Sequence, residues 1–117
     1  MSELSLMHLY PIDGAVHRVG QGEMAWNCRD ATWSMVIAGI DPDPRKAQAV
    51  TNWTKAYWKA VHPFNLDGAY PNFMMDDEGD ARLRATYGEN YPRLAALKKK
   101  YDPANLFRIN QNIKPAA

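Results

Sequence analysis

The middle of the chain carries a helix whose two ends are marked by local chemistry. The run Asp41-Pro42-Asp43-Pro44 predicts the start, with Asp43 as N-cap and Pro44 at the first helical position. The pair His62-Pro63 predicts the end, because the residue before a proline is driven out of the helical region. Between them, apolar and aromatic side chains recur at helical spacing at Ala47, Val50, Thr54, Tyr57, Trp58 and Val61. This stripe predicts a helix packed against a core, in preference to an exposed aromatic platform for stacking on a ligand.

The residues before this helix are typical of strands. Leu4 to Tyr10 is nearly all apolar, which predicts a strand covered on both faces. A turn is expected at Asp13-Gly14, with further strands over 15–19, around 24–26 and over 32–40. The connections are too short for parallel crossovers, so an antiparallel sheet of three to five strands is predicted.

Two more helices are predicted after the central one. The first covers 80–87 and ends at Gly88, a residue favoured just past a helix C-terminus. The second is capped by Asn90 and stopped by Asp102-Pro103. Strands followed by helices predict an α+β fold, in which an antiparallel sheet is packed by two or three helices.

Length and composition narrow the class of protein. The 117 residues allow one domain, 1–117, and a net charge of +1 argues against a nucleic-acid partner. The longest apolar run, Met35 to Ile40, is far shorter than the roughly 20 residues that a bilayer requires. A single cysteine fits a reducing compartment. We therefore expect a soluble, cytoplasmic protein without a membrane partner.

Side chains with metal or nucleophilic chemistry do not form a known pattern. The three histidines lack ligand spacing, and we expect no metal. The acids over 76–80 lack the spacing of a calcium loop and complement the dipole of the helix that follows. Cys28 precedes Arg29, which could lower a thiol pKa, although a buried and unreactive thiol is the favoured interpretation.

The last third of the chain carries three motifs in a fixed order. They are Tyr70-Pro71-Asn72-Phe73, then the run from Tyr87 to Leu94, then the run from Lys98 to Arg108 that leads into Asn110-Gln111-Asn112-Ile113. Together their order and spacing resemble the C-terminal, berberine-bridge-enzyme-like segment of FAD-linked oxidases. Residues 14–31 are also similar to the strands that precede this segment. The resemblance therefore covers nearly the whole chain but only the last part of a family member.

The resemblance implies FAD as cofactor and assigns roles to six residues. Tyr70 would be catalytic, and Asn72, Asn110 and Asn112 would contact the flavin. Phe73 and Arg29 would line the substrate pocket. In many family members the position of Phe73 holds a tyrosine proposed as general base; phenylalanine cannot take a proton, so the base would be Tyr70 or lie elsewhere. Tyr70 could instead be an ordinary aromatic residue of a loop. Asn110 and Asn112 could instead lie in a strand, where their side chains hydrogen-bond only to neighbouring residues.

Two main functions are compatible with these motifs. In the first, the chain is the substrate-domain segment of an FAD-linked oxidoreductase, covering the flavin and shaping the pocket for a small molecule together with an FAD-binding partner chain. In the second, it is a flavin-independent domain that binds a small metabolite or catalyses a cofactor-free cyclisation or isomerisation. Because a segment taken from such a fold would expose an apolar face, we expect a homodimer or a complex with that partner chain, and not a monomer.

Overall fold

The computed structural model describes residues 2–117, which form two compact units. Among the described residues, the sheet unit combines 2–12 with 32–66, and the helical unit combines 13–31 with 67–117. The prediction of a single domain over 1–117 stays a prediction.

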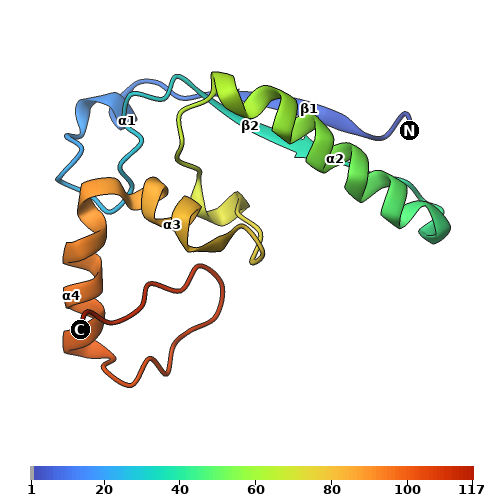
Figure 1. Ribbon diagram of the computed structural model, residues 1–117. Helices are drawn as coiled ribbons and strands as arrows, with labels where there is room; N and C mark the ends of the chain where they lie inside the picture. Colours follow the sequence, from blue (N-terminus) through green and yellow to red (C-terminus); the bar gives the residue numbers. More distant parts are fainter. Residues whose placement is uncertain (1) are drawn as a thin grey trace. The chain divides into compact units, whose positions relative to one another are not determined.

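The sheet unit is built on one antiparallel strand pair. Strand β1 (Leu6–Pro11) pairs with β2 (Trp33–Ala38), with Leu6 opposite Ala38 and Pro11 opposite Trp33 (Figure 1). The antiparallel direction and the α+β class are confirmed. The described residues contain two strands, however, which is fewer than the three to five predicted.

Two segments predicted as strands, 15–19 and 24–26, do not form strands, although their local sequence pattern favours an extended chain. Residues Ala15–Arg18 form the single helical turn α1 instead, and 24–26 are irregular. A strand needs a neighbouring backbone for its N–H and C=O groups, and β-propensity alone does not supply one. In the helical unit, loop contacts hold this region instead; one is the 3.0 Å hydrogen bond between His17 Nε2 and the Ala31 carbonyl.

Helix α2 (Ala47–Val61) packs against the end of β2. The predicted cap lies three residues earlier, on the 3-10 turn Pro44–Lys46 that leads into α2, where Asp43 Oδ1 accepts a 3.0 Å hydrogen bond from the Arg45 backbone N–H. Close packing requires Gly39, where a Cβ atom would lie only 2.3 Å from Thr54 Oγ1. Strand β1 is exposed at every residue after Leu6, so the prediction of a strand covered on both faces is wrong within this chain.

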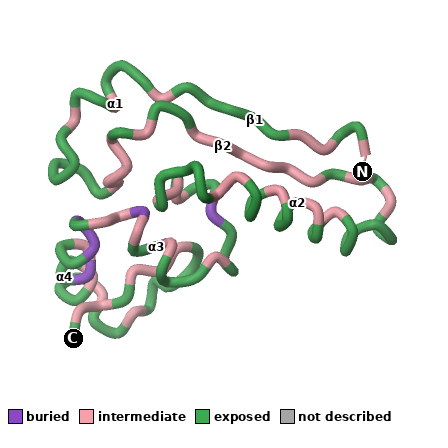
Figure 2. Tube along the Cα trace, turned by 45° about the horizontal axis from the view of Figure 1, so that its top comes forward, coloured by how far each residue is buried: buried purple, intermediate pink, exposed green. Residues whose placement is uncertain are grey.

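The helical unit contains every buried residue that the structure describes (Figure 2). Helix α3 (Gly79–Tyr87) ends at Gly88 as predicted, where the positive φ of 49° is a conformation that glycine adopts without steric cost. Helix α4 (Tyr91–Tyr101) follows. The buried apolar cluster consists of Met74, Leu83, Tyr91 and Ala95, with Ala69, Tyr87, Ile113 and Ala116 packed against it.

Asn90 begins α4 as predicted but does not cap it with its side chain. Its Nδ2 instead donates to three carbonyls of the loop before β2: Gln21 at 2.7 Å, Met24 at 3.0 Å and Ala25 at 3.4 Å. The amide group satisfies carbonyls that are distant in sequence, which no local pattern reveals. Asn90 therefore joins the loop over 21–25 to the start of α4.

Among residues 2–117, no helix combines the length and the apolar character that crossing a bilayer requires.

Candidate functional site

The Tyr70–Phe73 segment is a short turn of the helical unit. Pro71–Phe73 forms a 3-10 turn, in which the Phe73 N–H donates to the Tyr70 carbonyl at 2.9 Å. Proline at the first position fixes the backbone for this turn. The turn lies between Ala69 and Met74, which both belong to the packed cluster of the unit.

Three of the predicted site residues meet on this turn. Asn72 Nδ2 donates a 2.9 Å hydrogen bond to the Tyr70 hydroxyl oxygen. The rings of Tyr70 and Phe73 meet edge to face, with centroids 5.1 Å apart and planes at 80°. Tyr70 and Phe73 are 45% and 54% exposed, so the phenol, the amide and the phenyl ring are all available to a ligand. Because the Tyr70 oxygen accepts from Asn72, its own proton is left to donate to another group.

The predicted amides at the C-terminal end are tied to the same turn through the residue between them. Gln111 Nε2 donates to the Met74 carbonyl at 3.1 Å and to the Met75 carbonyl at 3.3 Å. Asn110 has a φ of 61°, a conformation that asparagine tolerates better than most residues. The Oδ1 atom of Asn112 is buried and has no hydrogen-bond partner among the described residues. Buried oxygen acceptors normally accept a hydrogen bond, so the Asn112 Oδ1 atom is unusual in accepting none from the described residues.

Arg29 approaches the turn indirectly. Its guanidinium lies 5.2 Å from the centroid of the Trp26 ring, and Nη1 donates to the Val16 carbonyl at 3.4 Å. Trp26 Nε1 in turn donates to the Ala69 carbonyl at 2.8 Å, immediately before Tyr70. The structure thus links Arg29 to the turn through the indole of Trp26.

Two of the acidic residues after the turn, Glu78 and Asp80, are paired with cations. Glu78 forms an ion pair with Arg82 one helical turn later, and Asp80 forms one with Lys114 at 3.0 Å. Glu78 Oε1 also accepts from the Met75 backbone N–H at 2.8 Å. No group of three or more His, Cys, Asp or Glu residues in 2–117 has the arrangement of a metal site.

Cys28 is half-buried in the helical unit. Its thiol lies 3.8 Å from the Thr86 carbonyl oxygen, and burial raises the pKa of this thiol. The alternative of a thiol with a lowered pKa beside Arg29 is therefore wrong. Cys28 fills space against Gly68, where a Cβ atom would lie 2.0 Å from its Sγ.

Three contacts around the turn were not singled out by the sequence. Trp26, Thr86 and Gln111 hold the residues just before and just after it. Trp26 and Gln111 stand inside or beside the motifs, but their partners are 43 and 37 residues away. Hydrogen bonds over such separations follow from the fold and have no local pattern.

A family model described as "Berberine and berberine like" matches residues 69–114, the region that contains the turn, α3, α4 and the three amides. Residues 69–114 thus match the berberine-bridge-enzyme-like segment of FAD-linked oxidases. The wild-type structure of Physcomitrella patens BBE-like 1 is similar to this chain, with a TM-score of 0.81 and 31% identity over 95% of this chain and 23% of that one.

Two sequence relatives bear names that agree with this assignment. An FAD-linked oxidoreductase of Dictyostelium discoideum is 31% identical over 87 residues, which are 74% of this chain and 18% of that protein. The uncharacterized FAD-linked oxidoreductase YgaK of Bacillus subtilis is 31% identical over 114 residues, 89% of this chain and 23% of that protein. The matched part of this chain thus spans only 18% and 23% of the length of these two relatives.

Proposed function

We propose that this chain acts as the substrate-domain segment of an FAD-linked oxidoreductase, where it covers the flavin and shapes the substrate pocket. The observation that carries the proposal is the hydrogen bond of 2.9 Å from Asn72 to Tyr70, on an exposed turn inside the family match. A phenol and an amide held together in this way present a donor and an acceptor side by side. That pair suits the recognition of a polar ring edge and of a substrate hydroxyl.

The residues present fit a flavin ring. The edge of the ring system carries both carbonyl oxygens and an imide N–H, so it requires donors and acceptors together. Asn72 and Asn110 have exposed amides, each of which offers both. Asn112 adds the buried Oδ1 atom that lacks a donor. We therefore assign Asn72, Asn110 and Asn112 to flavin contact and Tyr70 to the reacting end of the substrate.

Bound FAD supplies the two-electron acceptor for an oxidation. Tyr70 would orient the substrate through its phenol oxygen, to which Asn72 donates, and as the phenolate would take up a proton from the substrate. Phe73 contributes a ring that packs edge to face on Tyr70 and excludes water from one side of the phenol. Phe73 has no group that accepts a proton, so in this proposal Tyr70 takes that role. We assign Arg29, whose guanidinium lies over the Trp26 ring, to the lining of the substrate pocket.

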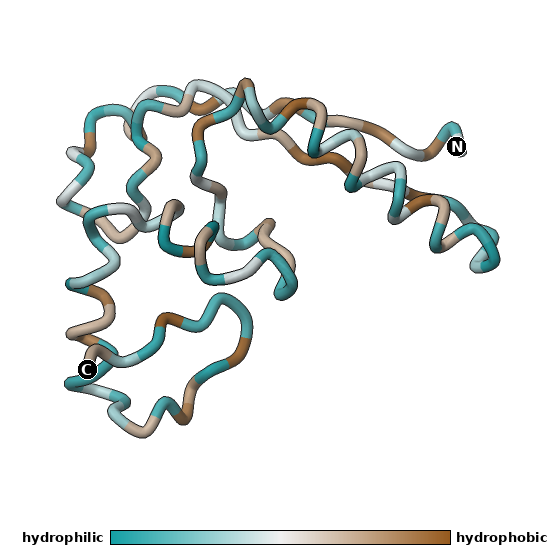
Figure 3. Tube along the Cα trace, viewed as in Figure 1, coloured by the Kyte–Doolittle hydropathy of each residue, from teal (hydrophilic) through white to brown (hydrophobic). Residues whose placement is uncertain are grey.

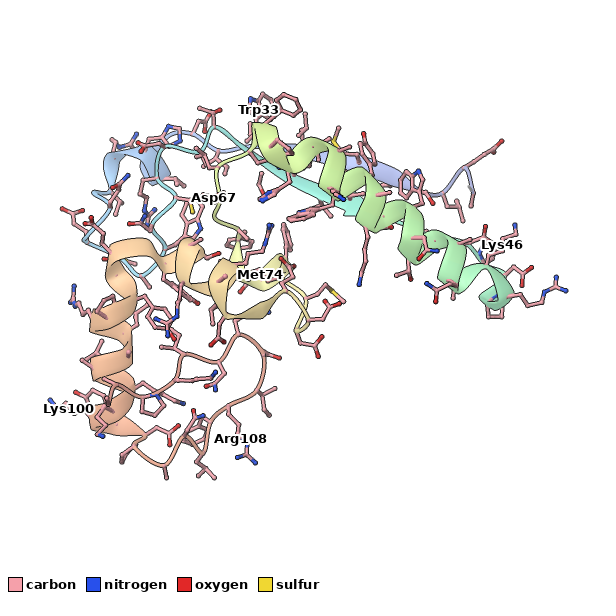
Figure 4. The ribbon with its side chains drawn as sticks, in the orientation of Figure 1. Trp33, Lys46, Asp67, Met74, Lys100 and Arg108 are labelled. Carbon is pink, nitrogen blue, oxygen red and sulfur yellow. The ribbon has the colours of Figure 1, made fainter. Side chains whose placement is uncertain are left out.

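The proposed partner is an FAD-binding chain or a second copy of this chain. In the helical unit, the loop after α4 exposes apolar side chains to solvent: Phe107 is 76% exposed and Ile109 is 85% exposed. The apolar stretches of this loop are brown in Figure 3, and Figure 4 labels Arg108, which lies between these two residues in the sequence. This loop is held in shape, because Asp102 accepts hydrogen bonds from the Leu106 and Phe107 backbone N–H groups at 2.8 and 3.0 Å. Exposed apolar patches on an ordered surface are typical of interaction sites, so this loop indicates a face that another protein surface covers.

In the sheet unit, strand β1 gives separate support for such a partner. Leu9 and Tyr10 are 52% and 45% exposed on a strand whose sheet has no third member among the described residues. Exposed strand edges with apolar side chains tend to pair with another chain. Sedimentation of the isolated protein should therefore give a mass above the 13.3 kDa of one copy. A mass of one copy at micromolar concentration, with no partner present, would contradict this part of the proposal.

The visible absorption spectrum of the purified chain tests the flavin directly. The chain should be yellow when it is co-purified with an FAD-binding partner, or should perturb the absorption bands of added FAD. The variant Asn72→Leu should weaken this perturbation at least tenfold, while Asn52→Leu on the exposed side of α2 should leave it unchanged. A spectrum identical to that of free FAD under all these conditions would reject flavin binding and favour the flavin-independent metabolite-binding domain.

A further inference from the structure

The Tyr70–Phe73 turn owes its orientation to contacts from outside it. A single 3-10 turn has poor hydrogen-bond geometry and little stability of its own. Both its aromatic rings are about half exposed, so burial does not hold them either. We propose that the hydroxyl of Thr86 is the positioning group for this turn, assisted by Trp26 and Gln111. The purpose of this positioning, which is to orient Tyr70 and Asn72 toward substrate and flavin, rests on the function proposed above.

Thr86 bridges the residue before the turn and the residue after it. Its Oγ1 accepts a hydrogen bond of 3.0 Å from the Ala69 N–H and lies 3.6 Å from Met74 Sδ. The same oxygen donates to the Arg82 carbonyl at 2.9 Å. One atom therefore contacts both ends of the turn that carries Tyr70.

The position of Thr86 is itself fixed. It is the one described residue with an exposed fraction of 0%. The bond from Oγ1 to the carbonyl four residues earlier in α3 selects its rotamer, and β-branching restricts that torsion further. The Thr86 carbonyl accepts from the Asn27 N–H at 3.3 Å and faces the Cys28 thiol. A buried hydroxyl on a helix is a more rigid support than a loop contact.

Two further anchors act on the same residues. Trp26 donates to the Ala69 carbonyl, so both backbone polar groups of Ala69 are engaged. Gln111 donates to the Met74 carbonyl, so Met74 is held by its backbone as well as by its sulfur. The turn is therefore fixed at both ends by side chains from three separate segments. Fixed ends keep the Tyr70 and Asn72 groups in one geometry before a ligand binds, which is the condition for efficient orientation of reacting groups.

Amide hydrogen exchange, followed by NMR on the full chain, tests this role. In Thr86→Val, which keeps the shape but removes the hydroxyl, the Ala69 and Phe73 amides should exchange at least tenfold faster. Amides within α4 should keep their rates. The Asn72 side-chain amide resonances should also shift, because its bond to Tyr70 depends on the turn. Thr86→Ser keeps the hydroxyl and should restore the wild-type pattern.

The matched control is Thr54→Val in α2. Thr54 Oγ1 makes the same kind of bond, to the Val50 carbonyl at 3.0 Å, but belongs to the sheet unit. This variant should leave the Ala69 and Phe73 amides at their wild-type rates.

Three results would overturn the proposal. They are unchanged exchange at Ala69 and Phe73 in Thr86→Val, an equal rise across the turn and α4, and a failure of Thr86→Ser to restore the pattern. If Thr86→Val does not fold, Trp26→Phe and Gln111→Met take its place, and each should accelerate the same turn amides at least tenfold. The exchange measurements need no flavin, so their outcome is independent of the FAD absorption test. Faster exchange in Thr86→Val together with no FAD binding would reject the proposed function but would still support the positioning role of Thr86.

Discussion

Replacing Gly68 by alanine places a Cβ atom 2.0 Å from the Sγ of Cys28. Non-bonded heavy atoms attract best at about 3.5–4.0 Å, so the added methyl group is about 1.5 Å too close. Retreat in the opposite direction is limited, because the same Cβ would already touch the Thr86 Cα at 3.5 Å and the Ala85 carbonyl oxygen at 3.6 Å. The strain would reach Ala69 and the Tyr70 turn, which follow directly in the chain.

The expected cost of Gly68→Ala is about 3 kcal/mol, the upper end of the range for overpacked sites. Cys28→Ala by itself should cost about 1 kcal/mol, since it removes one half-buried sulfur. The double variant should be more stable than the sum of the single costs predicts, by about 2 kcal/mol, because the atom responsible for the clash is gone. Urea unfolding followed by circular dichroism measures all three free energies, provided that the slope with denaturant is unchanged.

Gly22→Ala is the control for the effect of a methyl group in itself. A Cβ at Gly22 meets nothing within 4 Å, so this variant should stay within about 0.5 kcal/mol of the wild type. Additive costs in the Gly68→Ala, Cys28→Ala double variant would refute the reasoning, because they would show that the two sites do not touch. A Gly68→Ala protein as stable as the Gly22→Ala protein would refute it as well.

Three other predictions follow from single side chains. Asn90→Ala should lower the free energy of unfolding by about 1–3 kcal/mol, because three loop carbonyls lose their donor, and Asn90→Asp should be at least as harmful in the same urea assay. The hydrogen bond from Lys98 holds the pKa of Asp102 below its ordinary value. The stability that Asp102 adds is therefore present above pH about 4 and is lost as the pH falls through the pKa of the folded state. In Asp102→Asn, the free energy of unfolding should depend less on pH in this acidic range. Tyr70→Phe should reduce turnover at least tenfold, or about 1.4 kcal/mol of barrier, with an unchanged melting temperature, and equal losses of rate and stability would show a structural role instead.

Local chemistry in the sequence was sufficient to mark the turn that leads into α2 and the C-terminal ends of α3 and α4. Asp43 and Pro44 start the helical segment before α2, Gly88 ends α3, and Asp102 follows the last residue of α4, as predicted. Caps and stops depend on a side chain and the backbone within a few residues, so they can be recognised without the fold. The motifs over 70–113 likewise identify the family by their order and spacing, which are properties of the chain alone.

The tertiary structure decided which segments became strands and how the candidate site is held. Residues 15–18 and 24–26 had the composition of strands but lack a neighbouring strand among the described residues, and so became a helical turn and a loop. Asn90 had the chemistry of a cap but donates instead to carbonyls more than 60 residues away. The bond between Thr86 and Ala69 is invisible in the sequence for the same reason. Partners that are distant along the chain meet only after the chain folds, whereas a cap finds its partner within one turn.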